Sequence, residues 1–223
     1  MKNSWWKILC VLLLFYTLVA GLISPVPAMD ILNETIRNLY FHVPMWFGMM
    51  FLLTISLVYS IRHLSTQNPD HDRMAAQSAN VAMVLGLLGL LTGMVWANWT
   101  WGKPWVNDPK LNGVAVGMLA YLAYFILRGS MEDETKRARI SGVYNIFAYV
   151  MFMVFIMVLP RLTSSLHPGN GGNPAFGSYD LDNNMRLVFY PAVIGWSLLG
   201  LWITTLRVRI LRVADIAENK QAV

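Results

Sequence analysis

The sequence predicts an all-α integral membrane protein built as a bundle of six transmembrane helices. Of its 223 residues, 56% are hydrophobic and only 13% are charged, whereas charged residues make up about a quarter of an ordinary soluble domain. The apolar residues also gather into runs, and a helix needs roughly 20 residues to cross a bilayer. We place six runs, in a single domain covering residues 1–223, near residues 7–24, 43–62, 80–100, 112–128, 143–163 and 187–206.

The first run has two interpretations. A basic start, an apolar centre and a Val-x-Ala ending at Ala28 resemble a cleaved signal peptide. Trp5 and Trp6 are instead typical of a membrane-interface belt. We favour a retained helix.

The second run begins in the segment IRNLYFHVPMW, where Pro44 suits the first turn of a helix. The third and fourth runs flank a tryptophan-rich segment, considered below. The segment RGSMEDETKRARISG joins the fourth and fifth runs, and its mixed charges are typical of a solvated turn. After the sixth run, we expect the residues beyond Arg212 to form a short cytoplasmic helix or a disordered tail.

The distribution of lysine and arginine predicts the orientation. If the N-terminus lies inside, the inner segments hold 12 of the 17 lysines and arginines, and the outer segments hold the remaining 5. Because cytoplasmic loops carry the excess of these residues, both termini are expected in the cytoplasm. Three outer loops then follow, at residues 25–42, 101–111 and 164–186.

Charge and cysteine content exclude two classes of function. The net charge is +5, but the charges form short blocks between apolar runs, so no nucleic-acid partner is expected. Cys10 is the only cysteine. The chain therefore has neither an internal disulfide nor the Cys-x-x-Cys-His motif that attaches haem covalently.

Two of the four histidines stand out by position. His63 and His71 lie in a polar inner loop, where solvent exposure is expected, but His42 and His167 both fall at the outer membrane face. Each could be an ordinary interfacial residue. As a pair, two neutral imidazoles from separate helices suit a metal, or both axial positions of a haem iron. A bare zinc ion needs three or four protein ligands, whereas the porphyrin already supplies four nitrogens to a haem iron.

The segment WANWTWGKPWVNDPKL, residues 96–111, lies between these histidines in the sequence. Its tryptophans are typical either of an interface belt or of a flat aromatic platform for a tetrapyrrole. Because Gly102, Pro104 and Pro109 break helices, a shaped loop is expected from Trp101 to Lys110.

Charged residues near this loop have candidate roles as well. Asp108 is positioned to orient an indole N–H or a backbone turn. Lys103, Lys110 and Arg37 are available to pair with porphyrin propionates.

The segments NLYFHVPMW, WTWGKPWVNDPKL and LHPGN together resemble the CcmC-type haem-handling membrane proteins of cytochrome c maturation. These belong to the wider CcmC/CcmF/CcsA group, which shares a tryptophan-rich "WWD" loop. The core of that motif falls on Trp101, Gly102, Trp105 and Asp108, with Leu111 as the following leucine. Trp96 and Trp99 are then expected to be helix-end anchors.

The resemblance places the two family histidines on His42 and His167. The loop departs from the family at Pro104 and Asn107, which remove two aromatic faces. A further departure follows Asp108, where Pro109 and Lys110 replace the usual arginine.

The resemblance implies a haem carrier and not an enzyme. It implies that haem b is held non-covalently and transiently at the periplasmic face of the bacterial inner membrane, with His42 and His167 as axial ligands to the iron. It also implies delivery to the haem chaperone CcmE beside the ABC transporter subunits CcmA and CcmB and the small protein CcmD. The sequence has no nucleotide-binding Gly-rich Lys-Ser/Thr loop, so ATP hydrolysis is expected in a partner.

Two alternatives remain open from the sequence. One is a cytochrome b-like electron-transfer subunit that uses two histidines on haem, although ligands at one membrane edge fit this poorly. The other is a haem-free permease subunit whose tryptophans only anchor it in the membrane.

Overall fold

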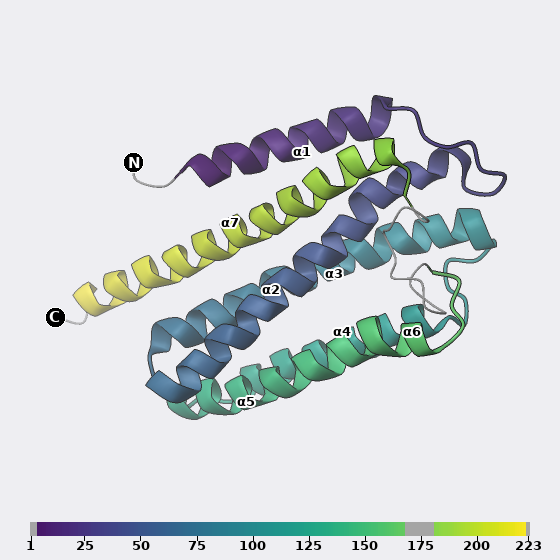
Figure 1. The fold of residues 1–223 in the computed structure, drawn as a ribbon. Coiled ribbons are helices and arrows are strands. Elements are labelled where there is room, and N and C mark those ends of the chain that lie inside the picture. Colours follow the sequence, from purple (N-terminus) through teal and green to yellow (C-terminus); the bar gives the residue numbers. More distant parts are fainter. Residues whose placement is uncertain (1–3, 168–180, 222–223) are drawn as a thin grey trace.

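The structure is a computed structural model that describes residues 4–167 and 181–221. Every regular secondary-structure element in these residues is a helix (Figure 1). The elements are α1 (Trp5–Ile23), the 3₁₀ segment η1 (Asn33–Asn38), α2 (Leu39–Thr66), α3 (Pro69–Trp101), α4 (Pro109–Gly129), α5 (Glu134–Met153), the π-helical segment η2 (Val154–Val158), α6 (Leu159–Leu162) and α7 (Asn183–Gln221).

Six helical stretches are long and apolar enough to cross a membrane, which confirms the predicted fold class. They are Trp5–Ile23, Asn33–Thr66, Pro69–Trp101, Pro109–Gly129, Glu134–Leu162 and Asn183–Ala217. Several extend well beyond the apolar runs, because capping residues and not hydropathy set their ends. In α3, for example, Pro69 occupies the first turn and the Asn68 side chain accepts a hydrogen bond from the Asp70 N–H.

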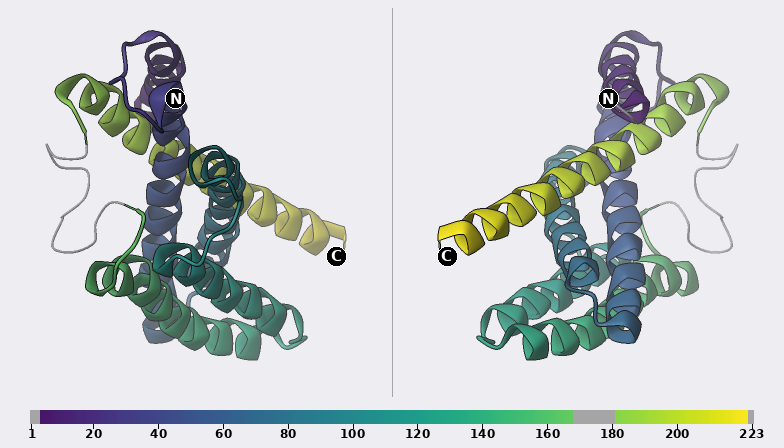
Figure 2. Two further views of the ribbon diagram at one scale, coloured as in Figure 1. Left: turned by 90° about the vertical axis from the view of Figure 1, so that its right-hand side faces the viewer. Right: turned by 90° about the vertical axis from the view of Figure 1, so that its left-hand side faces the viewer.

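The helices run alternately back and forth, so the start of α1 and the end of α7 lie at the same end of the bundle (Figure 1). The opposite end carries the connections at residues 24–38 and 102–108 together with residues 163–167, and we call it the histidine end. Figure 2 shows α7 crossing α2 and continuing past it, so the residues after Arg212 extend this helix. The retention of α1 in the mature protein stays a prediction.

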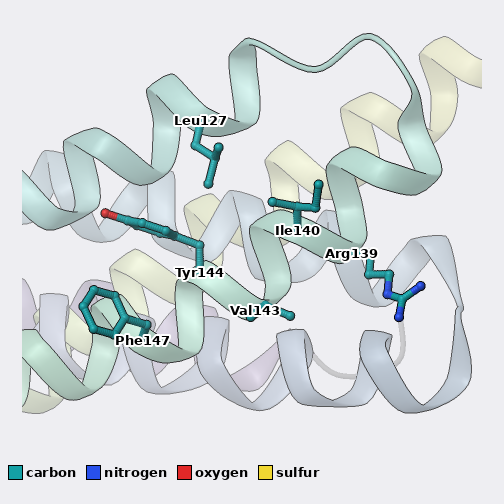
Figure 3. A pocket seen from close by; sticks show the side chains of 6 residues that line it. All are labelled: Leu127, Arg139, Ile140, Val143, Tyr144 and Phe147. Carbon is teal, nitrogen blue, oxygen red and sulfur yellow. The ribbon is translucent and has the colours of Figure 1, made fainter.

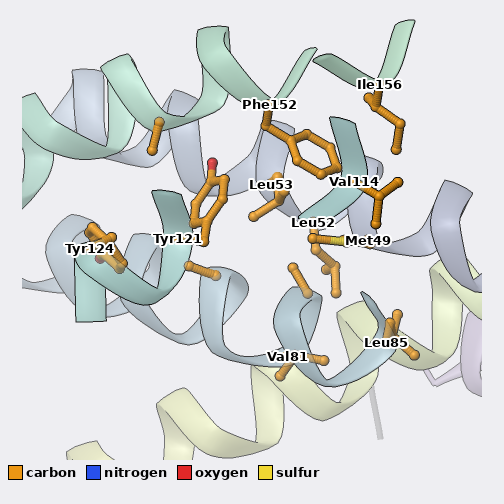
Figure 4. Close-up of a cluster of buried hydrophobic side chains, with 13 residues drawn as sticks. Met49, Leu52, Leu53, Val81, Leu85, Val114, Tyr121, Tyr124, Phe152 and Ile156 are labelled. Atoms are coloured by element: carbon orange, nitrogen blue, oxygen red, sulfur yellow. The ribbon is translucent and has the colours of Figure 1, made fainter. Parts of the chain in front are cut away.

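The central core lies between α2, α3, α4 and α5, where buried apolar side chains form one cluster (Figure 4). Small residues let the helices approach closely, as is usual in membranes, where lipid competes for apolar contacts. A methyl group at Gly86 would lie 2.5 Å from the Met49 sulfur, and one at Gly48 would lie 3.0 Å from Leu85 Cδ1. This close packing fixes α2 against α3 over most of their length.

Ion pairs hold the end opposite the histidine end. Arg128 of α4 binds both oxygens of Asp72 at the start of α3, at 2.8 and 2.5 Å. Arg73 pairs with Asp215 of α7. These contacts tie α3, α4 and α7 together where the helices leave the apolar region.

The last apolar stretch before the histidine end is irregular. Pro160, in the first turn of α6, has no N–H to donate to the preceding turn, and its ring crowds the carbonyl four residues earlier. The residues just before it, Val154–Val158, are π-helical, which is how membrane helices often absorb such a break. The chain then leaves the helix after Leu162 and leads to His167.

Candidate functional site

His42 lies in the first full turn of α2 and is pressed against α3. Its Nδ1 is 2.7 Å from the Gly89 carbonyl oxygen and 3.4 Å from Thr92 Oγ1. Because a carbonyl oxygen only accepts hydrogen bonds, Nδ1 carries the proton in this contact. The lone pair of the neutral ring is therefore on Nε2, the nitrogen available to a metal.

Glycines on α3 make room for this ring. A methyl group at Gly93 would lie 2.5 Å from His42 Cε1, so only glycine fits there with the ring in place. One turn earlier, a methyl group at Gly89 would lie 3.0 Å from Trp46 Nε1. Gly89 and Gly93, which we call the glycine face of α3, therefore make room for the side chains of Trp46 and His42.

Two indoles flank the His42 ring edge-on. The ring centroids of Trp46 and Trp96 are 6.4 and 6.1 Å from that of His42. Trp96 also donates from Nε1 to Thr35 Oγ1 at 3.2 Å. Trp96 is thus turned inward and its predicted role as a helix-end anchor is wrong, whereas Trp99 is 73% exposed, as an anchor should be.

His167 lies at the histidine end on the segment that follows α6. Its Nδ1 is 3.0 Å from Asp108 Oδ1, and its ring centroid is 5.0 Å from that of Trp101 at an interplanar angle of 76°. An ionised carboxylate only accepts, so Nδ1 carries the proton here too and Nε2 holds the lone pair of the neutral ring. The rest of the LHPGN motif, residues 168–170, lies outside the described residues.

Asp108 joins α4 to the segment that carries His167. Its Oδ1 accepts from the backbone N–H groups of Lys110 and Leu111 at 2.9 and 3.3 Å, which caps α4. Its Oδ2 accepts from Ser165 Oγ at 2.8 Å and from the Leu166 N–H at 2.7 Å. The predicted role in a backbone turn is confirmed, but the contact with His167 was not predicted.

Asp108 is ionised despite being only 2% exposed. Burial by itself would raise the pKa of this carboxyl. The hydrogen bonds from His167, the Leu166 N–H and Ser165 outweigh burial and hold the pKa below its usual range. A buried, fixed negative charge therefore stands behind the His167 ring.

The tryptophan-rich loop is shorter than the sequence predicted. Trp101 is the last residue of α3, and Gly102 ends that helix in the left-handed conformation, at φ 74°. A methyl group at Gly102 would meet nothing within 4 Å, so its backbone conformation, not space, favours glycine. Pro109 and Lys110 were expected in the loop, but Pro109 opens α4, because proline is suited to the first turn of a helix.

The remaining loop residues differ in solvent exposure. Trp105 is half-buried, while Lys103 and Pro104 are exposed. Asn107 accepts from Asn112 Nδ2 at 2.7 Å, so it stabilises the turn into α4. Pro104 and Asn107, the two departures from the family loop, are therefore both exposed.

Of the three candidate propionate partners, Lys103 is exposed, whereas Arg37 and Lys110 are half-buried. Arg37 is engaged within the protein, since it binds Glu34 Oε2 at 2.6 Å and the carbonyl oxygens of Gly21 and Ser24 at 3.0 and 2.7 Å. It thereby fastens η1 to the end of α1. Lys110 is half-buried in the first turn of α4, close enough for its charge to act on His42.

The two histidines share one neighbour, α3. His42 contacts it at Gly89 and Gly93, and His167 contacts it at Trp101. Eight residues separate Gly93 from Trp101, a rise of about 12 Å along a helix. Among residues 4–167 and 181–221, no group of three or more His, Cys, Asp or Glu side chains is placed to hold a bare metal ion.

The other two histidines lie at the opposite end. His63 was expected to be solvent-exposed, but it is only 5% exposed, because its Nδ1 binds the Asn68 carbonyl oxygen at 2.9 Å inside the turn between α2 and α3. His71 is half-buried against Tyr59, with Nδ1 2.9 Å from Thr66 Oγ1. Both histidines form hydrogen bonds within the α2–α3 turn, and neither lies at the histidine end.

A pocket of about 380 Å³ also lies away from the histidines (Figure 3). It is formed by the last turns of α4 and the first half of α5, and its lining is almost wholly apolar. The lining residues are Leu127, Arg139, Ile140, Val143, Tyr144 and Phe147.

Known proteins similar to this chain include members of the heme exporter protein C family. The family model CcmC, described as heme exporter protein C, matches residues 2–222. "Heme exporter protein C" of Paracoccus denitrificans is 26% identical over 177 residues, which cover 79% of this chain and 73% of that protein. Its Rhodobacter capsulatus counterpart is 28% identical over 159 residues, 69% of this chain and 65% of that protein. A shorter match, 33% identical over 86 residues, covers 39% of this chain and 28% of "Cytochrome c biogenesis protein CcsA" from Prochlorococcus marinus.

Proposed function

Because this chain belongs to the CcmC family of heme exporter C proteins, we propose that it is a haem carrier of cytochrome c maturation. In this proposal, His42 and His167 are the axial ligands of a non-covalently held haem b at the periplasmic face of a bacterial inner membrane. One observation carries the proposal. Both histidines lie at one end of the bundle, and each has its Nδ1 proton bound by an acceptor, which puts the lone pair of each neutral ring on Nε2.

The donor set fits haem better than a bare metal ion. Ligating histidines usually donate their other ring N–H to a carbonyl or carboxylate, and both patterns occur here. Haem needs only two protein ligands because the porphyrin supplies the other four. Of the histidines with such a contact, two, His42 and His167, lie at the histidine end. The described residues hold no cluster of three or more metal-ligating side chains.

Aromatic surface near both histidines supports the same ligand. Trp101 packs on His167, and Trp46 and Trp96 pack on His42. Large aromatic rings bury a flat tetrapyrrole with little loss of side-chain freedom. We propose that Trp101 and Trp105 form the platform, with Gly102 and Asp108 setting its shape. Lys103 and Lys110 are proposed to pair with the propionates, and Arg37 to do so only by exchanging its present partners.

The proposed place in the pathway is transfer, with no bond made or broken in haem by this chain. A site at one end of the bundle favours release to another protein over deep storage. We propose CcmE as the recipient and CcmA, CcmB and CcmD as the companion subunits, with ATP hydrolysis in CcmA and CcmB. The same placement weighs against a cytochrome b-like role, because electron transfer across the membrane needs a redox cofactor inside the bilayer.

Haem binding by substituted protein tests the proposal. We expect His42→Ala and His167→Ala each to weaken haem binding at least tenfold in a titration of the purified protein, because each removes one iron ligand. His71→Ala is the matched control, since it removes a histidine from the opposite end and should leave the titration unchanged. Equal haem affinity in all four proteins would rule out the proposed ligands, and rapid reduction by a quinol would favour the electron-transfer alternative.

A further inference from the structure

We propose that Asp108 is a positioning residue that makes His167 the stronger of the two axial ligands, so that His42 is given up first when haem is passed on. This inference rests on the proposed function. It concerns what stands behind each histidine, on the side of the ring away from the ligating nitrogen.

The two Nδ1 acceptors differ in charge. His42 donates to the neutral backbone carbonyl of Gly89, whereas His167 donates to the carboxylate of Asp108. A charged acceptor pulls the Nδ1 proton more strongly, which adds electron density to the ring and makes Nε2 a better donor to iron. Hydrogen bonds to a charged partner are roughly twice as strong as those between neutral groups.

Distance works slightly the other way but does not reverse the order. The His42 contact is 2.7 Å and the His167 contact is 3.0 Å. Since Coulomb energy varies as the inverse of distance, this difference changes the interaction by only about a tenth. The full charge on Asp108 therefore decides which ring is more electron-rich.

Asp108 cannot easily turn away from His167. Its two oxygens also accept from the N–H groups of Lys110, Leu111 and Leu166 and from Ser165 Oγ. These donors belong to two different segments, the first turn of α4 and the residues before His167. Rotation of the carboxylate would break the cap of α4 and the attachment of His167 together.

Among the residues that the structure describes, the groups that contact the His42 ring carry no charge. Its described neighbours on α2 and α3 are Gly89, Thr92, Gly93, Trp46 and Trp96. All are uncharged.

The test uses the iron–histidine stretching frequency of the ferrous protein, measured by resonance Raman spectroscopy on haem-loaded variants. His42→Ala leaves His167 as the only axial histidine, and His167→Ala leaves His42. We expect the higher frequency in His42→Ala, because its remaining ligand has the carboxylate behind it. Adding Asp108→Asn to His42→Ala should lower the frequency towards that of His167→Ala. Asparagine caps helices as well as aspartate does, so α4 keeps its cap.

Carbon monoxide identifies the ligand that leaves first. In the ferrous wild-type protein it should replace His42, so that its adduct has the C–O and Fe–C frequencies of the His42→Ala adduct. Asp133→Asn is the control for loss of a capping carboxylate, since Asp133 caps α5 through Lys136 and contacts no histidine. It should change neither set of frequencies.

Equal iron–histidine frequencies in His42→Ala and His167→Ala would overturn this inference even if Asp108→Asn failed to fold. A wild-type adduct that matched His167→Ala would overturn it as well. If the wild-type protein held no haem at all, the proposed function itself would fall, and this inference with it.

Discussion

At the scale of single residues, the site depends on a glycine that makes room for one histidine ring and on hydrogen-bond acceptors that orient both rings. Gly93 leaves space for the His42 ring, and the Gly89 carbonyl fixes the ring's proton. Asp108 does the equivalent for His167 with a charge. The sequence indicated both histidines and Asp108, because polar groups at a membrane edge stand out. It did not indicate Gly89, Gly93 or Trp46, because a glycine or tryptophan in an apolar helix has no distinctive signal until its neighbour is known.

Substitution of Gly93 tests the seat of His42. Gly93→Ala places a methyl group 2.5 Å from His42 Cε1, so the ring or the helix must move. Overpacking of this kind costs about 1–3 kcal/mol, and we expect haem affinity to fall by about tenfold or more. Gly129→Ala is the control, since a methyl group there meets nothing within 4 Å. Unchanged affinity in Gly93→Ala would mean that His42 is not held as described.

The pH dependence of stability tests the Asp108 contacts. The pKa of Asp108 is lowered in the folded protein, so its contribution to stability is complete above the ordinary carboxyl pKa of about 3.9 and is lost as pH falls through the folded value. We expect Asp108→Asn to lower the melting temperature at pH 7 and to remove part of the fall seen below pH ~4. Parallel melting curves for wild type and variant from pH 7 to pH 3 would contradict this role.

At the scale of elements, hydropathy predicted that six helices exist but not where they end. The third helix begins at Pro69, well before the apolar run at residue 80, because Asn68 caps it and polar residues continue the helix past the lipid-facing part. Pro109 looked like a helix breaker, yet it opens α4 with Asp108 as the cap. Local capping chemistry, which a hydropathy window does not register, decided each of these boundaries.

The end of α3 offers a test at this scale. Gly102→Ala forces alanine into the left-handed region, which costs about 1–2 kcal/mol. We expect a lower melting temperature together with weaker haem binding, since Trp101 immediately precedes this residue and packs on His167. Asn107→Ala is a useful comparison within the loop, because it removes the hydrogen bond from Asn112 without strain at the helix end. An unchanged Gly102→Ala protein would show that the end of α3 does not position the site.

At the scale of the whole molecule, α3 links the two halves of the site. It seats His42 through its glycine face and meets His167 through its last residue. The sequence placed the two histidines at the same membrane face from charge alone. That both rest on α3, and that Asp108 contacts His167 59 positions later in the chain, depends on helix packing and was not predictable from local pattern.

Cysteine labelling tests the orientation of the bundle. Lys103 lies at the histidine end and Arg137 lies at the opposite end, and both are exposed or half-buried. In a Cys10→Ser background, which removes the only native thiol, we expect Lys103→Cys to react with a membrane-impermeant maleimide in intact cells. Arg137→Cys should react only after the membrane is opened. The reverse pattern would place the histidine end in the cytoplasm.

In the proposed function, His42 and His167 together hold one haem iron. Near-infrared magnetic circular dichroism of the ferric, haem-loaded wild-type protein tests this most directly, because its charge-transfer band identifies the axial ligands of low-spin haem. We expect the band of two histidine ligands, lost in both His42→Ala and His167→Ala and kept in His71→Ala. A high-spin spectrum in the wild type, or a two-histidine band that survives either substitution, would contradict it.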